Sequence, residues 1–490
     1  MSIESLRDYL PIAEKHGLMK RVTAEVDKDW EIGAVIREIY DNITPENRYG
    51  VYFENVKGSQ FPFVVGIVGP TREAASLVLE APQDKLMEKM LNAFEHPIDP
   101  VIVAEGPCQE NVLTGDQVDL HLFPFPTYSA GRDGGNYIIP GCIISKDPET
   151  GIRNSAVYRS QIIGKNKLTF GAGRVKGAYA HYAKQEAKGE GLDIAISIGV
   201  DPVIWFVGPG LFEHGLDELS IAGGLRGKPV ELVKCKTVDL EVPANAEIVI
   251  EGVVLPKERG PEGPFGEAAG YMEGVLPDRP VVEIKCITYR NNAICQGNVA
   301  QKPPNEAENA GSLLNEALLF RKLTKGIGLR GIVDLAKLRG AGMGHLVIKV
   351  KKLPPGQNKR ILNAAWVCDT LAKFISVVDE DIDIRNTAQV LWALAYRCQP
   401  HRDIQIVEDA PQIQDPSTGT FGWRPSNGSK ILIDATMKFD YPDVAVPAPE
   451  YMEKVKNDWA KYGLPLTTVL ADVHKPLEVE VQAPTSTPIN

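Results

Sequence analysis

The sequence predicts an α/β protein of several domains (α+β in overall organisation), with a strand-rich centre between two regions that mix helices and strands. With 490 residues, the chain is too long for one simple core. From Tyr137 to Tyr289 short apolar runs alternate with glycine-rich turns, which is typical of many short strands. After about residue 311 helical and strand-like segments alternate, which indicates a separate α/β unit.

Residues 1–112 form the predicted N-terminal α/β region. Ser5 to Ala13 has the spacing of an amphipathic helix, and Gly50 to Phe53 and Phe63 to Val68 have strand patterns. Leu113 to Pro126 is rich in acids, proline and phenylalanine, and we expect the next domain to begin there.

Residues 113–310 form the predicted central domain. The number of short strands favours a barrel or a sandwich between about residues 115 and 305. The expected strands are Ile138 to Ile144, Ser155 to Ile163, Ile194 to Val200, Val203 to Val207, Ile248 to Leu255 and Val281 to Tyr289.

Residues 311–445 form the predicted C-terminal α/β domain, with a largely parallel sheet. We expect helices at Leu313 to Leu323 and Asn358 to Ala372, and strands at Gly326 to Val333, His345 to Val350 and Phe374 to Val378. Residues 446–490 follow as a terminal helix and a tail, which we expect to be disordered from Gln482 onward. Trp459 and Tyr462 on that helix suit either docking to another subunit or a local core.

Composition excludes several classes of protein. The net charge of −11 argues against a broad basic face for nucleic acid. No run of 18 apolar residues predicts a membrane span, and the first ten residues lack the apolar segment of a secretory signal. Seven cysteines without a CxxC pair suit reduced thiols, so we expect a cytoplasmic protein.

The segment from Pro261 to Glu267 (PEGPFGE) is the most informative motif. Its glycines and prolines favour neither helix nor strand, so it is expected to be a rigid loop that holds Glu262 and Glu267 at a set separation. Such a pair can have different pKa values and perform different roles. Alternatively, the two glutamates are ordinary solvated loop acids.

Asn154 to Arg159 begins with a turn residue and continues as a strand. Arg159 could hold a carboxylate through two parallel N–H bonds, or could form a surface ion pair. Asn154 and Arg159 are five positions apart and would face opposite sides of a regular strand, unless a bulge or bend intervenes.

Two further segments allow more than one interpretation. Asp217 and Glu218 open an expected helix that ends near Gly227, where acids are favoured by the helix dipole, although a carboxylate beside an amide oxygen also suits a divalent cation. Lys430 follows a Gly-Ser turn and could reach a phosphate, but the segment is not a Walker motif and a lone lysine is usually solvated.

Together these segments resemble the UbiD family of decarboxylases, which use prenylated flavin mononucleotide (FMN). The resemblance extends from about residue 5 to residue 463, and the Glu-Gly-Pro-Phe-Gly-Glu loop is its most specific part. It implies an N-terminal α/β region, a central split β-barrel of the FMN-binding kind and a C-terminal α/β domain used in oligomerisation. It also implies an active site between the last two domains and a homo-oligomer, either a dimer or a hexamer.

The resemblance implies a role for each singled-out residue. Arg159, Glu262 and Glu267 match the catalytic Glu-Arg-Glu trio, and Glu267 is the expected proton donor because this chemistry needs a protonated acid near neutral pH. Asn154 and Glu218 match ligands of a divalent cation, usually Mn2+, that bridges to the cofactor phosphate; K+ is a further candidate ion. The expected cofactor-binding residues are Asn154, Ser155, Ala156, Val157, Tyr158, Arg159, Arg174, Lys176, Glu218 and Lys430.

One position departs from the family pattern. Where members usually have a metal-binding histidine, this chain has Lys176, whose ammonium has no lone pair for a cation. Either His181 takes the role through a local shift, or Arg174 and Lys176 bind the phosphate directly and the metal is weakened or absent. We favour the second interpretation.

The implied activity is reversible, non-oxidative decarboxylation of an aromatic, heteroaromatic or α,β-unsaturated carboxylic acid. It depends on a UbiX-type flavin prenyltransferase to supply the cofactor. The alternative is a non-catalytic prenylated-FMN-binding subunit of a carboxylase complex, which the complete trio disfavours. We expect the substrate pocket near Cys295 to Asn305 and Trp423, and the polar residues Gln296, Asn298, Gln301 and Lys302 favour a substrate with a second polar group.

Overall fold

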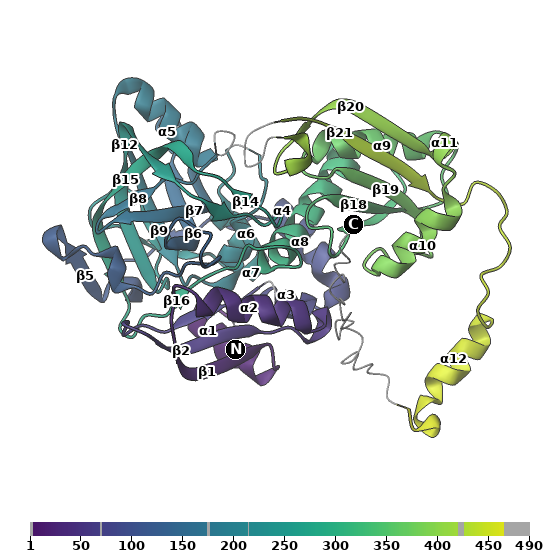
Figure 1. Cartoon of the computed structure of the whole chain (residues 1–490), viewed down its shortest axis with the longest axis horizontal. Helices are drawn as coiled ribbons and strands as arrows, with labels where there is room; N and C mark the ends of the chain where they lie inside the picture. Colours follow the sequence, from purple (N-terminus) through teal and green to yellow (C-terminus); the bar gives the residue numbers. More distant parts are fainter. Residues whose placement is uncertain (1–2, 69–70, 174–176, 214, 420–425, 465–490) are drawn as a thin grey trace, which may run out of the picture. The chain divides into compact units, whose positions relative to one another are not determined.

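A computed structural model of the chain describes residues 3–68, 71–173, 177–213, 215–419 and 426–464 (Figure 1). Residues 1–438 form one compact unit, and residues 439–490 a second. The larger unit contains all of the elements that build the candidate site.

The N-terminal part of the larger unit is a small sheet with helices, as predicted. Its strand order is β1-β2-β3-β16, so Cys295–Gln296 from the end of the central region completes it. Ser5 caps the first helix by accepting from the Asp8 amide. The elements are α1 (Leu6–Lys15), β1 (Met19–Val26), α2 (Glu31–Asn42), β2 (Gly50–Val56), β3 (Phe63–Val65), α3 (Arg72–Val78) and α4 (Leu86–Glu95).

The central region is a closed β-barrel of six strands. The order β12-β9-β6-β7-β8-β15 is closed by a further pairing of β12 with β15, so the barrel has no free edge. Every pairing in it is antiparallel, and β5 (Asn111–Thr114) extends β15 on the outside. The strands are β6 (Tyr137–Lys146), β7 (Arg153–Gly164), β8 (Lys167–Thr169), β9 (Leu192–Ile198), β12 (Ile248–Glu262) and β15 (Leu276–Tyr289).

Shorter elements surround the barrel. They include a three-stranded sheet, a two-stranded hairpin and three helices. Gly227 ends the helix α7 (Glu218–Arg226) with a left-handed backbone (φ 74°), as expected for a glycine at that position. The elements are β4 (Val101–Ile102), α5 (Gly177–Lys188), α6 (Pro202–Val207), α7 (Glu218–Arg226), β10 (Glu231–Lys234), β11 (Glu241–Pro243), β13 (Phe265–Gly266), β14 (Met272–Glu273).

The strand predicted at Val203 to Val207 is wrong, because these residues form α6. Asp201 caps the helix by accepting from the Val203 amide, and Pro202 occupies the first turn, where its missing N–H costs nothing. The apolar run misled the prediction because α6 is buried on all sides, and periodicity cannot separate a buried helix from a buried strand.

The C-terminal α/β region has a five-stranded sheet of order β17-β18-β19-β21-β20. Only the two central pairings are parallel and both outer ones are antiparallel, so the prediction of a largely parallel sheet is wrong. The expected strand from Gly326 is also misplaced: a π-helical turn (Lys322–Gly326) comes first. The elements are α8 (Glu306–Arg321), β17 (Ile332–Lys337), β18 (His345–Val350), α9 (Gln357–Cys368), β19 (Phe374–Asp379), α10 (Thr387–Arg397), α11 (Pro400–Asp403), β20 (Ile404–Gln412) and β21 (Ser426–Ala435).

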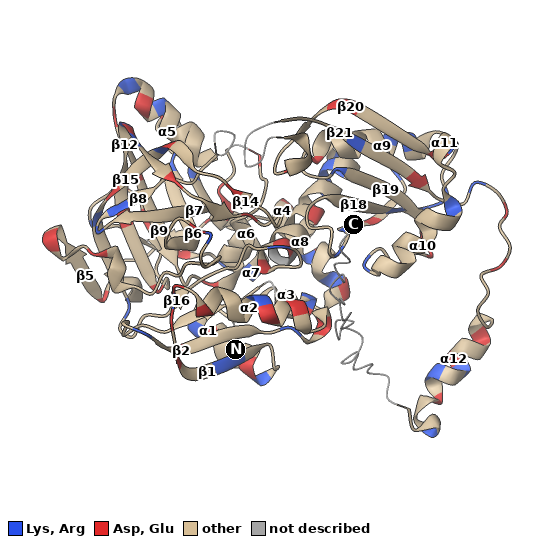
Figure 2. Cartoon of the chain, in the orientation of Figure 1, with Lys and Arg blue, Asp and Glu red and all other residues tan. Residues whose placement is uncertain are grey.

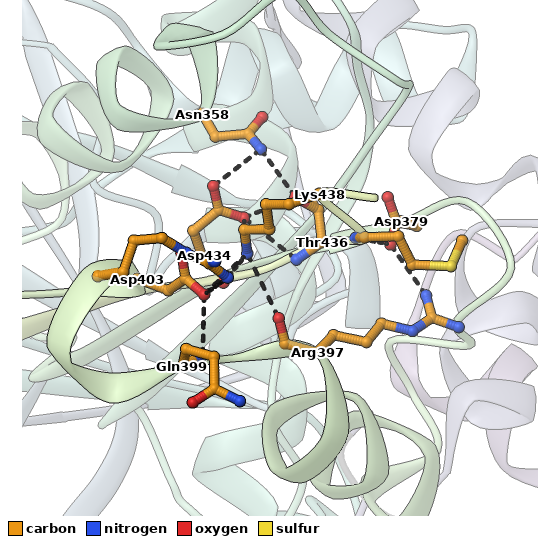
Figure 3. Close-up of polar contacts among 10 residues, drawn as sticks. Asn358, Asp379, Arg397, Gln399, Asp403, Asp434, Thr436 and Lys438 are labelled. Atoms are coloured by element: carbon orange, nitrogen blue, oxygen red, sulfur yellow. Dashed lines mark hydrogen bonds and ion pairs between the residues drawn. The ribbon is translucent and has the colours of Figure 1, made fainter. Parts of the chain in front are cut away.

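A polar network ties this sheet to its helices where β19 and β21 end (Figure 3). Arg397 at the end of α10 donates to Asp379 (2.9 Å) and to Asp381 (2.6 and 2.8 Å). Lys438 forms ion pairs with Asp434 (3.1 Å) and Asp403 (3.5 Å). Because its acids are paired internally with cations, we interpret this cluster as structural.

The smaller unit contains α12 (Pro449–Asn457) and a 3-10 turn (Trp459–Tyr462). None of their residues is buried, and the Trp459 and Tyr462 rings contact each other edge to face. The local-core interpretation of these two residues is therefore wrong within this unit, and their docking role stays a prediction.

Positive and negative side chains are interspersed along the elements (Figure 2). No helix among the described residues is long and apolar enough to cross a membrane.

We expect Arg397→Leu to destabilise the larger unit by about 3 kcal/mol, because the change leaves Asp379 and Asp381 without their shared cation. The Arg397 side chain is 2% exposed. Chemical denaturation followed by circular dichroism measures the effect. Arg360→Leu, at an exposed position on α9, is the control, and equal stability of the two variants would contradict the assignment.

Candidate active site

A cavity of about 610 Å³ lies against the barrel strand β7 and receives residues from several other elements. Cofactor-sized sites have volumes in this range. Acidic and basic side chains gather at two places on its wall: around Arg159, and around Asn154 and Glu218. Between them the wall is mostly apolar, formed by Ile139, Ala156, Val157, Phe265, Ala268, Ala300, Leu371.

Strand β7 brings Asn154 and Arg159 to the same cavity. The β6–β7 register runs regularly from Lys146 to Gly141 and then shifts before Ile138, so β6 has one extra residue opposite Arg159. A bulge of this kind bends the strand pair and redirects side chains. The extra residue belongs to β6, and the consecutive β7 residues Ala156 to Arg159 all line the cavity, so both faces of β7 contribute to its wall.

Arg159 is the centre of the catalytic candidates, and three glutamates surround it. Its Nε donates to Glu262 Oε1 at 2.5 Å, its Nη1 to Glu267 Oε1 and its Nη2 to Glu273 Oε2. The Phe265 ring lies below the guanidinium, with the Cζ atom 4.6 Å from the ring centroid. The structure therefore brings together all three residues predicted as catalytic and adds Glu273.

The loop that carries Glu262 and Glu267 is fixed by its neighbours. Asp133 accepts from the Gly266 amide (3.0 Å) and from the Ser129 amide (2.6 Å). Gly134 lies so close to this loop that an added Cβ would be 2.1 Å from the Gly263 carbonyl oxygen. The prediction of a loop is wrong for most of this segment, because Pro261 and Glu262 end β12 and Phe265–Gly266 form β13. Both acids are buried, so the solvated-loop alternative is wrong as well.

Glu267 is buried, and burial raises the pKa of its carboxyl group. The charge of Arg159 opposes that rise, while Glu273 and Glu262 add to it. Gln414 donates its side-chain N–H to Glu267 Oε2 at 2.6 Å. Gln414 has a positive φ of 58°, which is uncommon for a residue other than glycine. Nothing in its sequence surroundings identified this residue.

Glu262 is fully buried at the end of β12. Besides Arg159, it lies 3.2 Å from Arg279 Nε of β15. Two guanidinium groups thus face this carboxylate, which suits a role in orienting Arg159.

Asn154 and Glu218 meet at the other polar part of the cavity. Asn154 Nδ2 donates to Glu218 Oε1 (2.7 Å), and the Ser155 amide donates to Glu218 Oε2 (2.7 Å). Glu218 lies in the first turn of α7, and burial raises its pKa to about 7. A buried carboxylate beside an amide oxygen fits a hard divalent cation, but the described residues include no group of three or more His, Cys, Asp or Glu side chains placed to hold a metal.

Ala156, Val157 and Tyr158 continue along the cavity wall, and Ser155 is buried behind it. Arg174 and Lys176 lie outside the described residues. The described chain resumes at Gly177, where an added Cβ would be 3.1 Å from Asn154 Nδ2.

Three basic residues line the cavity near Asn154. The His181 ring lies there, with Nδ1 3.0 Å from Ser145 Oγ and Nε2 3.9 Å from Asp147. Arg153 and Lys184 also line the cavity. Arg153 is paired with Asp217 and Glu241, and Lys184 with Asp147 and Glu149. This part of the wall therefore offers N–H donors whose charge is already balanced by acids.

Lys430 is placed elsewhere. Its ammonium is enclosed by the carbonyl oxygens of Asp369, Thr370 and Ala372 (2.6 to 3.3 Å) and by Gln412 Oε1 (3.1 Å). It is not among the described residues that line the main cavity. These contacts give Lys430 a structural role in joining β21 to the start of β19.

The expected substrate segment is only partly at the cavity. Asn298 lines it, whereas Gln301 donates to backbone carbonyls (Gly33 and Tyr128) and Gln296 belongs to β16. Of the four polar residues singled out there, Asn298 alone is among the described lining residues of the main cavity. Trp423 lies outside the described residues.

Comparison with known proteins supports the same family. The three domain models of 3-octaprenyl-4-hydroxybenzoate carboxy-lyase, UbiD, match in order: the N-terminal domain at residues 11–94, the Rift-related domain at 101–303 and the C-terminal domain at 308–435. An uncharacterized protein of Synechocystis, sll0936, is 33% identical over 94% of this chain and 96% of its own length.

Solved structures agree. The UbiD-class enzyme HmfF of Pelotomaculum thermopropionicum, in complex with FMN, is 33% identical over 92% of this chain and 99% of its own, with a TM-score of 0.83. An evolved dimeric form of HmfF, in complex with prFMN, is 32% identical over 91% of this chain and 98% of its own, with a TM-score of 0.81. Vanillic acid decarboxylase of Sedimentibacter hydroxybenzoicus, in its closed form, is 28% identical over 93% of this chain and 99% of its own, with a TM-score of 0.81.

The barrel and the buried Glu-Arg-Glu constellation define a UbiD-class protein. The chain belongs to the UbiD family.

We expect Gly171→Ala to disrupt the site by displacing the β7 backbone at Arg159. An added Cβ would be 1.8 Å from the Arg159 carbonyl oxygen, so β7 must shift, at a cost of about 2 kcal/mol. Thermal denaturation and the flavin content of the purified protein measure the result. Gly164→Ala is the matched control, because its Cβ would meet Lys167 Cβ at an ordinary 3.7 Å; equal behaviour of the two variants would contradict the close approach.

Proposed function

We propose that the protein is a prenylated-FMN-dependent decarboxylase of an aromatic, heteroaromatic or α,β-unsaturated carboxylic acid. The observation that carries the proposal is the buried contact of Arg159 with Glu262 and Glu267 on the wall of a cofactor-sized cavity. Family membership supports the same reaction class.

The residues of the cavity fit the flavin. Its mostly apolar middle suits a flat ring system, and the Asn154 region, with Arg153, His181 and Lys184, offers N–H donors to a phosphate. When bound, the prenylated flavin would supply the electron sink for the negative charge that loss of CO2 leaves.

Each member of the trio then has a chemical role. Arg159 binds and orients carboxylates at the cavity wall. Glu267, whose pKa burial raises, donates a proton to the carbon that lost CO2. Glu262 holds Arg159 in place from the barrel side. Because a proton donor can also take the proton back, we propose that the reaction is reversible.

For the cofactor phosphate we propose Asn154 and Glu218 as ligands of a divalent cation, with Mn2+ the first candidate and K+ a further ion. Arg174 and Lys176 would contact the phosphate directly. We propose Ser155 to Tyr158 as the strand that contacts the cofactor.

The substrate would be small and mainly apolar. A second cavity of about 160 Å³, lined in part by Gln414, shares Met343 and Leu371 with the main one. Met343, Leu371 and Phe265 line the same cavity as Glu267 and offer apolar contacts there. Of the four residues on which the expected second polar group rested, only Asn298 is among the described lining residues of the main cavity. We therefore replace that expectation and propose a single unsaturated ring or chain with one carboxylate.

We further propose a cytoplasmic homo-oligomer, a dimer or a hexamer, supplied with cofactor by a UbiX-type prenyltransferase. The complete trio argues against the non-catalytic subunit.

Co-expression with a flavin prenyltransferase, followed by anaerobic purification, tests the proposal. We expect prenylated FMN in the mass spectrum and CO2 release from one member of a panel of aromatic, heteroaromatic and acrylic acids. A divalent metal in elemental analysis would support the Asn154–Glu218 site, and flavin without metal would support direct binding of the phosphate by Arg174 and Lys176. Protein without any flavin, or loaded protein inactive on the whole panel, would contradict it.

Glu267→Gln should lower decarboxylation by at least about 100-fold, because it removes a general acid, while the flavin stays bound. Exchange of substrate hydrogen with solvent should fall with it. The exposed Glu190→Gln serves as the control. Undiminished turnover in Glu267→Gln would remove the proton-donor assignment.

A further inference from the structure

A third carboxylate completes the surroundings of Arg159. Glu273 lies on β14, and the β13–β14 pairing places it opposite Phe265, the residue under the guanidinium. Its side chain is 2% exposed and contacts Arg159 Nη2. Neither the sequence motif nor the predicted trio included it, because it lies six residues beyond Glu267.

Glu273 changes the balance of charge in the cluster. Three carboxyl groups (Glu262, Glu267, Glu273) face two guanidinium groups (Arg159, Arg279) in a buried place. Without a further cation, ionisation of all three acids would leave one uncompensated buried charge, which is costly. Like charges at such short range favour a proton on one member of the set.

Glu267 is the member most suited to hold that proton. Glu262 lies near both guanidinium groups, whereas Glu267 shares Arg159 with two competitors and receives its other contact from the neutral amide of Gln414. Each further carboxylate on Arg159 reduces the stabilisation that its guanidinium gives to the ionised form of Glu267.

We propose that Glu273 is a positioning residue for the proton donor: by occupying Arg159 Nη2 with a negative charge, it keeps the proton on Glu267. This inference rests on the proposed function. Glu273 itself transfers nothing. It acts by making the acid form of its neighbour the stable one before the substrate arrives.

The other groups that face the cluster leave this assignment in place. Asp133, on the loop before β6, accepts from two amides, and burial raises its pKa. Tyr137 of β6 donates to the Pro264 carbonyl (3.4 Å), and burial raises its pKa as well. Neither group supplies positive charge to offset that of Glu273.

Infrared titration of the full chain without flavin tests the inference independently of turnover. The protonated-carboxyl band that Glu267→Gln abolishes should persist to neutral pH in the wild type. In Glu273→Gln its midpoint should move to lower pH by about one unit, the size of a close charge effect. Glu273→Asp, which keeps the charge, and the surface variant Glu190→Gln should leave the midpoint near the wild-type value.

The pH profile of decarboxylation in the loaded protein is the second readout. With Glu273→Gln, the fall of kcat at high pH should begin about one unit lower, while kcat on the acidic side stays near the wild-type value. Glu273→Met provides another neutral variant if Glu273→Gln does not fold. An unmoved midpoint, or an equal loss of kcat at every pH, would overturn the inference. A wild type inactive on all acids would contradict the proposed function, and the infrared result would still decide the role of Glu273.

Discussion

The contact between one guanidinium group and its ring of carboxylates is the constraint on which the site depends. Arg159 is buried, so its charge requires acidic partners close by. Those partners come from the end of a barrel strand and from the short hairpin that follows it. The barrel supplies the rigid frame that holds Arg159 against them, and the planar guanidinium fixes the direction in which each one points.

Much of the fold could be predicted from patterns that reflect local physics. The strands with clear apolar runs, such as Ile248 to Leu255, and the helix that Gly227 ends are found where the sequence indicates them. The region from Val203 to Val207 could not be assigned by periodicity, because an apolar run buried on all sides has the same pattern in both states. The mixture of parallel and antiparallel strands in the C-terminal sheet could not be predicted either. Strand direction depends on which strands pair in the folded protein, and the local sequence pattern does not encode that pairing.

The site divides in the same way. Glu262 and Glu267 could be identified because they lie in one short rigid motif, and Arg159 because its segment resembles a family sequence. Glu273 and Gln414 could not. They reach the cluster through the β13–β14 pairing and through an uncommon backbone conformation after β20, and neither feature has a signature at the residue itself. For Lys430 the local sequence was misleading. The Gly-Ser turn before it suggested a phosphate contact, but backbone carbonyls surround its ammonium group.

The length of β12 has a consequence for how the protein folds. This one strand closes the barrel against β15 and ends at Glu262, so the strand that closes the barrel also carries one of the partners of Arg159. The contact of Glu262 with Arg159 spans 103 positions of sequence and pays a loop-closure entropy that the local β13–β14 hairpin does not. A chain can therefore be compact and rich in secondary structure while its catalytic groups are still apart. We expect the return of activity during refolding to follow this long-range contact and not the formation of secondary structure.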